Sequence, residues 1–268
     1  MRALVLDAAG RPQLADLPAP DPSVAVLACG LCGSDVEKIG RASAGTVLGH
    51  EVVVRAGERR LALLHHRPCG ECARCRSGHE STCARFAERA RAQDWVDLPA
   101  GIDDARGTYV EPLACVLRGL DLLPRGRALV VGLGFVGRLF AAALQLRGDH
   151  VSALEPNPAR RVLDEPDGPV DAAVLCAPAA ADDALRALEP GGTLLVFAPA
   201  AVADLELVYR RELRVLGSRS ATPAAMRRAV ELLPRLELPP PRVLPLTRFA
   251  DGLDLYRGGR ELKVVFTP

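Results

Sequence analysis

Four cysteines in the first third of the chain have a spacing that suits a single metal ion. They form the pattern C-x2-C-x2-C-x7-C, and they are Cys69, Cys72, Cys75 and Cys83. Four thiolates this close together can surround one Zn²⁺ tetrahedrally and leave no position open, as in a structural site. A disulfide pair and an iron–sulfur cluster are the alternatives. A cluster pattern of this kind expects a proline after the fourth cysteine, where this chain has Ala84.

A second group of potential metal ligands is spread over three separate segments. Cys32 lies in Gly-Leu-Cys-Gly-Ser-Asp, His50 in Gly-His-Glu, and Glu111 in Tyr-Val-Glu-Pro-Leu-Ala. A thiolate, an imidazole and a carboxylate from separate loops would make a zinc site whose fourth position is open to substrate. Asp35 and Glu51 stand where carboxylates can orient such ligands. Spacing alone leaves open that His50 is an ordinary, partly buried histidine and Cys32 a small core residue.

A glycine-rich turn begins the second half of the chain. The apolar run Ala128–Val131 predicts a buried parallel strand, and an apolar pattern at helical spacing follows the turn as far as Gly148. In such a unit the glycines make the tight turn, let the backbone approach a pyrophosphate, and let helix and strand pack closely. We therefore predict a dinucleotide site, although an ordinary turn in an α/β sheet is the alternative. The predicted contact residues are Gly132, Gly134, Phe135, Val136 and Gly137.

An acidic residue ends the next predicted strand, His150–Leu154. Glu155 follows Gly137 at close to the ~20-residue separation typical of a ribose-binding carboxylate. A carboxylate there accepts hydrogen bonds from the ribose hydroxyls and repels a 2′-phosphate, so we expect NAD to be preferred to NADP. Arg160 and Arg161 oppose this expectation, because a nearby guanidinium can pair with that phosphate.

Length and composition exclude several classes of protein. The 268 residues are enough for about two domains, and 49% hydrophobic and 25% charged residues are typical of a soluble globular protein. A formal net charge of +1 gives no reason to expect nucleic acid or an acidic membrane as a partner. No apolar run of ~18 residues is present, and the first residues do not form a signal peptide. The metal-like cysteine spacing fits a reducing cytoplasm, where we expect the protein to be located.

The elements that must position these residues are of two kinds. From Ala128 to residue 217, apolar runs alternate with helical segments, which predicts a parallel sheet with crossover helices. The connection 155–170 is too short for a further β–α–β unit, so we expect one strand of a standard sheet to be missing. A helix capped by Thr222 leads to residues 243–266, whose two apolar runs are expected to return to the first domain. That domain is predicted to be irregular and β-rich from apolar runs at residues 2–7, 24–28, 48–55 and 61–65.

The order of the motifs resembles the zinc-dependent medium-chain dehydrogenase/reductase family, which includes alcohol, polyol and threonine dehydrogenases. The motifs are Gly-Leu-Cys-Gly-Ser-Asp, Gly-His-Glu, the four cysteines, Glu-Pro-Leu-Ala and Gly-Leu-Gly-Phe-Val-Gly, and together they cover nearly the whole chain. The resemblance implies an α/β fold with a β-rich GroES-like catalytic domain at 1–114, to which 222–268 return. It also implies a doubly wound Rossmann domain at 115–221, with the active site in the cleft between the domains.

The resemblance also implies roles for individual residues. Cys32 and His50 would bind a catalytic zinc, and either Glu51 or Glu111 would complete its ligand shell. Ser34 would relay the substrate proton. The four cysteines of the first pattern would hold a structural zinc.

Lys263 stands where family members place a basic residue that approaches the cofactor phosphates. The chain departs from the family at Glu37, where relatives carry a histidine three residues after the relay hydroxyl. We hypothesise that Glu37 accepts the relayed proton; the alternative is a solvated surface acid, with the proton leaving through water. The chain is also shorter than its relatives, around 52–64 and between 155 and 171, so the substrate pocket is expected to differ.

We therefore expect an enzyme that interconverts an alcohol, such as a secondary alcohol or a polyol, with its ketone or aldehyde. Hydride transfer would use NAD, and the protein would hold a catalytic and a structural zinc. The expected partners are the small-molecule substrate and further copies of the chain in a dimer or tetramer. The alternative is a non-catalytic zinc- and nucleotide-binding protein, a redox sensor or scaffold derived from the same fold. The presence of Cys32, Ser34 and His50 argues against that alternative.

Overall fold

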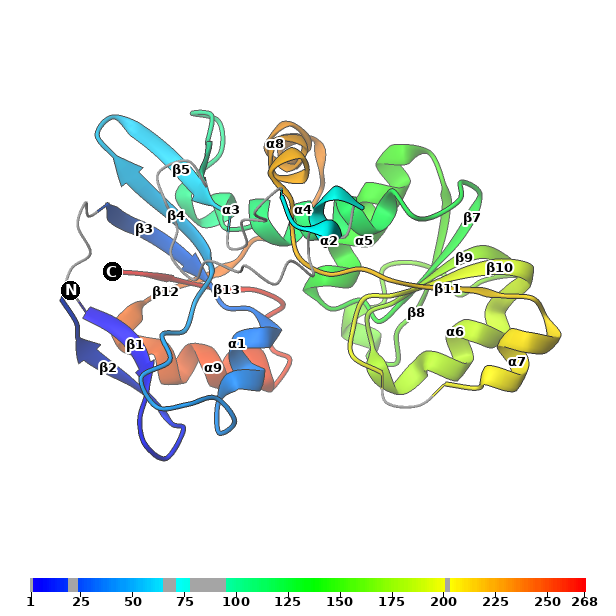
Figure 1. The fold of residues 1–268 in the computed structure, drawn as a ribbon, viewed down its shortest axis with the longest axis horizontal. Coiled ribbons are helices and arrows are strands. Elements are labelled where there is room, and N and C mark those ends of the chain that lie inside the picture. The colour runs from blue at the N-terminus through cyan, green and yellow to red at the C-terminus, as the bar shows by residue number, and fades with distance from the viewer. Residues whose placement is uncertain (1, 19–23, 65–70, 78–94, 201–202) are drawn as a thin grey trace. The chain divides into compact units, whose positions relative to one another are not determined.

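The structure is a computed structural model, and it describes residues 2–18, 24–64, 71–77, 95–200 and 203–268 (Figure 1). Contacts divide the chain into two units. The first unit is Met1–Arg67, Arg85–Glu111 and Pro239–Pro268, and the second is Pro68–Ala84 and Pro112–Leu238. The predicted domain limits, which assign 222–238 to the first domain, stay a prediction.

The first unit contains a six-stranded sheet in the order β12-β13-β3-β4-β5-β6. All its neighbours are antiparallel except β12 and β13. The last two strands of the chain thus join the sheet of the first unit, as the sequence predicted. The strands are β3 (Ala25–Gly30), β4 (Glu51–Ala56), β5 (Arg59–Leu63), β6 (Trp95–Asp97), β12 (Arg242–Pro245) and β13 (Val264–Thr267).

A two-stranded antiparallel sheet of β1 (Arg2–Leu6) and β2 (Pro12–Asp16) accompanies it. The strand β2 was not predicted, because residues 12–16 were interpreted as part of a proline-rich connection. Pro12 is the first residue of that strand, a position where the missing N–H is tolerated. Three helices complete the described part of the unit: α1 (Gly33–Lys38), α3 (Asp104–Gly107) and α9 (Phe249–Arg257). Its core joins β1 and β13 to α9 through Leu6, Phe266 and Phe249.

The second unit contains a parallel sheet in the order β11-β10-β9-β7-β8. A doubly wound sheet has the order 3-2-1-4-5-6, and this order matches it with the third strand absent. The connection from β8 to β9 contains only the 3-10 turn Pro158–Arg160, which confirms the predicted missing strand. The strands are β7 (Arg127–Val131), β8 (His150–Leu154), β9 (Val170–Leu175), β10 (Leu188–Val196) and β11 (Arg214–Gly217).

Helices cover both faces of this parallel sheet (Figure 1). Helix α5 (Phe135–Arg147) packs on β7 and β8, and α6 (Ala181–Ala187) packs on β9 and β10. Helix α5 ends at Gly148 in the left-handed conformation, as predicted. The remaining helices are α2 (Ala73–Arg76), α4 (Val110–Leu120), α7 (Leu205–Arg210) and α8 (Pro223–Leu232). None of the helices in the described part of the chain is long and apolar enough to cross a membrane.

Candidate active site

Cys32 lies at the junction between β3 and α1, where it is the N-cap residue of the helix. Its backbone N–H donates to Asp35 Oδ2 at 3.3 Å, which fixes the direction in which the chain enters the helix. The hydroxyl of Ser34 donates to Cys32 Sγ at 3.4 Å. Ser34 is exposed, so its hydroxyl can exchange protons with solvent as well as with a molecule bound beside Cys32.

His50 comes directly before β4 and is held by the same aspartate. Gly49 adopts φ +98°, in the region that favours glycine, and its N–H donates to Asp35 Oδ1 at 3.1 Å. His50 Nδ1 lies 3.2 Å from that oxygen. Because Asp35 holds the Nδ1 side of the ring, Nε2 is left to bind a metal. Asp35 is 1% exposed, and it therefore orients both Cys32 and His50 from a buried position.

The structure brings Cys32, His50 and Glu51 together. The Sγ atom, a ring nitrogen and a carboxylate oxygen of these residues all lie within 4.8 Å of one another. Sulfur, nitrogen and oxygen donors in this arrangement fit Zn²⁺, whose bonds to them are about 2.0–2.3 Å long. Glu111 lies in the first turn of α4 and is 7% exposed, but its carboxylate does not belong to this group. Of the two carboxylates that the sequence left as candidates, Glu51 is the one in this group, and the choice of metal ligand between them stays a prediction.

The charges around His50 bind its proton tightly when no metal is present. Burial lowers the pKa of His50, but hydrogen bonds with Asp35 and Cys32 and the charge of Glu111 raise it, to about 11 overall. Burial would raise the pKa of Asp35, yet hydrogen bonds from His50 and Gly49 hold it below its usual value. A metal ion must therefore displace a proton from the imidazole, and its affinity will fall as the pH falls.

Glu51 also forms a buried ion pair with Lys263. The Glu51 and Lys263 side chains are each 2% exposed, and Lys263 Nζ contacts Glu51 Oε2 and donates to Leu31 O at 3.2 Å. Gly30 makes room for the pair, since a Cβ there would lie 2.2 Å from Glu51 Oε2. The structure thus places Lys263 against a metal-ligand candidate. The contact between Lys263 and the cofactor phosphates, expected from the family resemblance, finds no support in this geometry.

Removing Lys263 is expected to destabilise the first unit by roughly 3–5 kcal/mol, because it leaves the Glu51 carboxylate buried without a partner. We expect Lys263→Met to lower the midpoint of denaturant unfolding, followed by the fluorescence of Trp95 in β6. The double variant Lys263→Met/Glu51→Gln should regain much of the loss, since no charge remains buried. An equal loss of stability in the single and double variants would show that an unpaired Glu51 charge is not the cause.

One residue near the site, Tyr256, was not identified by the sequence analysis. Tyr256 of α9 lies close to the start of α1, and a Cβ on Gly33 would be 3.4 Å from its hydroxyl. Burial raises the pKa of Tyr256, and the charges of Cys32 and Glu51 add to this effect. No spacing signal links Tyr256 to Cys32 in the sequence. Glu37 is exposed on α1, and its part in a proton relay stays a prediction.

The glycine turn has the geometry that a dinucleotide requires. Gly132 has φ +92°, and a Cβ on Gly137 would lie 1.9 Å from Gly132 O, so helix and turn pack in direct contact. A Cβ on Gly134, the N-cap of α5, would meet no atom within 4 Å. Open space at this position, at the N-terminus of a 13-residue helix, fits a pyrophosphate. Phe135 is buried and Val136 half-buried at the start of the helix.

Glu155 lies at the same turn. It is 7% exposed, and Oε2 accepts from Leu133 N–H at 2.7 Å, while Oε1 accepts from Asn157 N–H at 3.0 Å. Its remaining lone pairs can accept ribose hydroxyls. Two arginine side chains lie near Glu155, and one of them, Arg161, donates to its backbone oxygen at 3.2 Å. Burial lowers the pKa of Arg138, whose guanidinium interacts with Glu155 and donates to Arg160 O at 2.7 Å. Arg138 was not recognised in the sequence, although it directly follows the third glycine.

The four-cysteine pattern is only partly within the described residues. Cys72 and Cys75 flank the start of α2, and their sulfur atoms are 3.5 Å apart. This separation suits two thiolates on one tetrahedral ion. Cys69 and Cys83 lie outside the described residues, so the structural zinc site stays a prediction.

Comparison with known proteins identifies the family. A D-altritol 5-dehydrogenase of Agrobacterium fabrum is 30% identical over 289 residues, which cover 82% of this chain and 84% of the relative. No protein-family model matches the chain. The chain belongs to the zinc-binding medium-chain alcohol and polyol dehydrogenase family, and it is an oxidoreductase of that class. The alignment is longer than the 268 residues of the chain, so the relative has segments that this chain lacks.

Solved structures share the fold over the whole chain. A putative zinc-binding dehydrogenase from Sinorhizobium meliloti, bound to NADP, has a TM-score of 0.85 at 22% identity, covering 100% of this chain and 99% of its own. An acetophenone reductase from Geotrichum candidum, in complex with NAD, has a TM-score of 0.83 at 20% identity, covering 100% and 97%. These likenesses confirm the predicted combination of a Rossmann-type parallel sheet and a β-rich part.

Proposed function

We propose that the protein oxidises a polyol or another secondary alcohol to its ketone, and catalyses the reverse reaction, with a zinc ion and NAD. The observation that carries this proposal is the convergence of Cys32, His50 and Glu51 within 4.8 Å. Asp35 orients Cys32 and His50, and the Ser34 hydroxyl donates to the Cys32 sulfur. Three protein ligands leave a fourth position for substrate, which distinguishes a catalytic from a structural zinc site.

The residues of the candidate active site have separate roles in this reaction. Cys32, His50 and Glu51 hold the metal, with Glu111 acting on His50 through its charge. When bound, zinc supplies a Lewis acid that lowers the pKa of a substrate hydroxyl, and the nicotinamide supplies the hydride acceptor. Ser34 accepts the substrate proton and passes it towards solvent, with Glu37 as the next acceptor on the same helix.

The cofactor and substrate preferences rest on local chemistry and on relatives. Glu155 at the glycine turn favours the unphosphorylated ribose of NAD, although Arg138 and Arg160 lie close enough to oppose it. The A. fabrum relative is named for the polyol D-altritol, and that name supports a polyol substrate. Homo-oligomerisation as a dimer or tetramer is part of the proposal.

A panel of polyols and secondary alcohols tests the proposal directly. The purified protein is mixed with NAD or NADP and each alcohol in turn, and reduced cofactor is measured. We expect turnover with at least one polyol and a higher kcat/KM for NAD than for NADP. Absence of turnover across the panel, with zinc present in the protein, would instead support a non-catalytic protein of this fold.

A structural zinc is proposed at Cys69, Cys72, Cys75 and Cys83. We therefore expect two zinc ions per chain by elemental analysis. Cys75→Ser should leave one zinc and unfold the four-cysteine segment, because structural zinc contributes folding free energy, about 10 kcal/mol or more in isolated zinc peptides. Cys176→Ala, which changes a half-buried cysteine directly after β9, should retain both ions. Two zinc ions in the Cys75→Ser variant would refute this assignment.

A further inference from the structure

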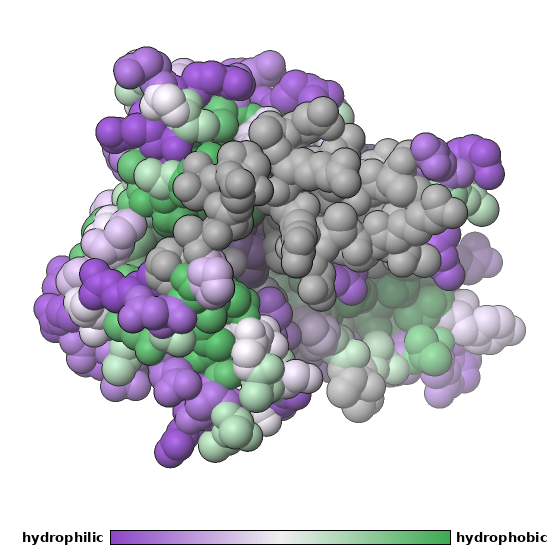
Figure 2. All heavy atoms as spheres, turned by 60° about the vertical axis from the view of Figure 1, so that its left-hand side comes forward, coloured by the Kyte–Doolittle hydropathy of each residue, from purple (hydrophilic) through white to green (hydrophobic). Residues whose placement is uncertain are grey.

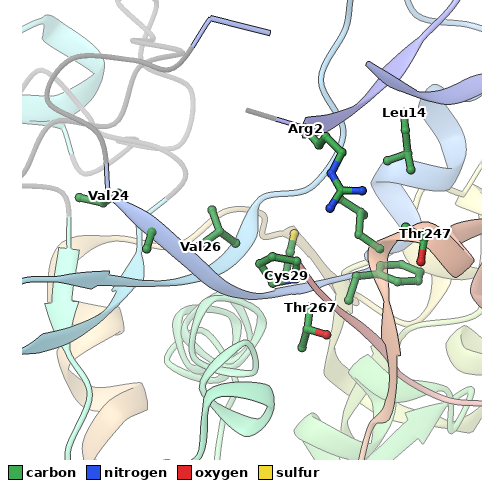
Figure 3. Close-up of a pocket in the computed structure, with 11 residues that line it drawn as sticks. Arg2, Leu14, Val24, Val26, Cys29, Thr247 and Thr267 are labelled. Carbon is green, nitrogen blue, oxygen red and sulfur yellow. The ribbon is translucent and has the colours of Figure 1, made fainter. Parts of the chain in front are cut away.

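A cavity of about 420 Å³ lies in the first unit, where β1 and β2 face the sheet strands β3 and β13 (Figure 3). Its size falls within the ~300–1,000 Å³ of small-molecule sites. The lining residues come from both ends of the chain, from Arg2 to Pro268. Cys32, Ser34, His50 and Glu51 do not line it, so this cavity is not the candidate active site.

The walls of the cavity are mainly apolar and partly open to solvent. Leu14 and Val26 are 39% and 44% exposed, whereas Phe266, which also lines the cavity, is buried and belongs to the core of the unit. Figure 2 shows hydrophobic residues reaching the surface among hydrophilic ones on the side that carries β1 and β2. Apolar side chains gathered around a concave surface, unlike single exposed ones, are typical of binding sites.

One cation extends into this apolar space. Figure 3 shows the Arg2 side chain reaching from β1 into the region between Leu14, Cys29 and Thr247. Other surface arginines of the first unit form ion pairs, as Arg59 does with Asp97 and Arg248 does with Asp251. Among the residues that the structure describes, no carboxylate pairs with Arg2. The cavity therefore offers a guanidinium fork, the geometry that matches a carboxylate, at the edge of an apolar surface.

We propose that this cavity binds a small amphipathic carboxylate. Its apolar body lies on Leu14, Val26 and Phe266, and its carboxylate pairs with the Arg2 guanidinium, with the Thr247 hydroxyl close by as a further donor. Charge complementarity selects an anion over a neutral or cationic ligand of the same shape. The ligand needs an apolar body because binding is favoured by removing its apolar surface, and that of the cavity walls, from water.

The thiol in the wall does not make this a covalent site. Burial raises the pKa of Cys29 to about 12, so its thiol stays protonated and unreactive. Its sulfur packs against Gly49, where a Cβ would lie 2.6 Å away. The bound carboxylate is thus held by non-covalent contacts alone.

Titration calorimetry with octanoate tests the proposal on the full chain. We expect octanoate to bind with one-to-one stoichiometry, and methyl octanoate, which lacks the charge, to bind at least tenfold more weakly. Arg2→Gln should weaken octanoate binding at least tenfold, whereas Arg41→Gln, which changes an exposed arginine away from the cavity, should leave it unchanged. Absence of octanoate binding, or equal binding by the Arg2→Gln variant, would overturn the proposal.

A second variant keeps the test valid if Arg2→Gln affects folding. Val26→Glu places an acid at an exposed position of the wall, where it can pair with Arg2 and repel octanoate. We expect this variant to unfold at the wild-type temperature and to lose octanoate binding. Octanoate could bind instead through its carboxylate at the candidate zinc site. In that case chelation of the metal would abolish octanoate binding, and both cavity variants would retain it. That pattern of results would also overturn the proposal.

Discussion

Replacing Cys32 with serine is expected to remove one of two zinc ions and to lower kcat/KM by about 10³-fold or more, with the fold retained. A serine hydroxyl does not ionise near neutral pH, so it cannot replace the thiolate as a charged metal ligand. Mutating a residue that only orients a ligand costs about 10–100-fold, and loss of a ligand should exceed that. Cys32 is a half-buried N-cap residue, so its replacement leaves the sheet intact.

Cys29→Ser is the matched control for this substitution. Cys29 lies near the end of β3, three residues before Cys32, and it is not part of the group formed by Cys32, His50 and Glu51. We expect Cys29→Ser to retain two zinc ions and activity within a few fold of wild type. The kcat/KM of Asp35→Asn should lie between those of Cys32→Ser and Cys29→Ser, because this substitution weakens the orientation of His50 without removing a metal ligand. Full activity of Cys32→Ser would contradict the assignment of the catalytic centre.

The second large effect concerns two glycines of the same turn. Substituting one by alanine should impair cofactor binding, and substituting the other should lower stability. A Cβ on Gly134 meets open space, so Gly134→Ala is expected to fold normally. The added methyl group would occupy the place where the backbone approaches the pyrophosphate, and we expect about 100-fold weaker NADH binding, or ~2.7 kcal/mol. A Cβ on Gly137 lies 1.9 Å from Gly132 O, so Gly137→Ala must displace the turn and lower the unfolding temperature.

Thermal unfolding and NADH titration of both variants separate these outcomes. Normal stability with lost binding is expected for Gly134→Ala, and reduced stability for Gly137→Ala. If Gly134→Ala binds NADH as the wild type does, the turn does not hold the cofactor. Equal destabilisation by both substitutions would show that Gly134 is required for packing instead.

Local patterns in the sequence predicted the parallel sheet accurately. The observed β8 matches the predicted strand His150–Leu154 residue for residue, and Gly148 and Thr222 cap their helices as expected. These features depend on periodicity and on capping chemistry, which act over a few residues. The missing strand was predictable for the same reason, since the 155–170 connection is too short to contain it.

Long-range pairing was not predictable from such patterns. Lys263 and Glu51 are 212 residues apart, and only the folded sheet brings β13 and β4 to either side of β3. Tyr256 reaches the start of α1 through the packing of α9, for which spacing gives no sign. The sequence likewise did not decide between Glu51 and Glu111 as metal ligand, because both carboxylates lie in plausible motifs.

The central claim is tested most directly by measuring how the rate of polyol oxidation depends on the zinc bound to the protein. The protein is stripped of metal by a chelator that is then removed, zinc is returned in measured equivalents, and alcohol-dependent reduction of NAD and of NADP is followed. We predict that turnover disappears with the metal and returns in proportion to the zinc rebound, and that it never returns in Cys32→Ser. Full turnover by the metal-free protein, or none by protein that holds zinc at Cys32, would contradict this account.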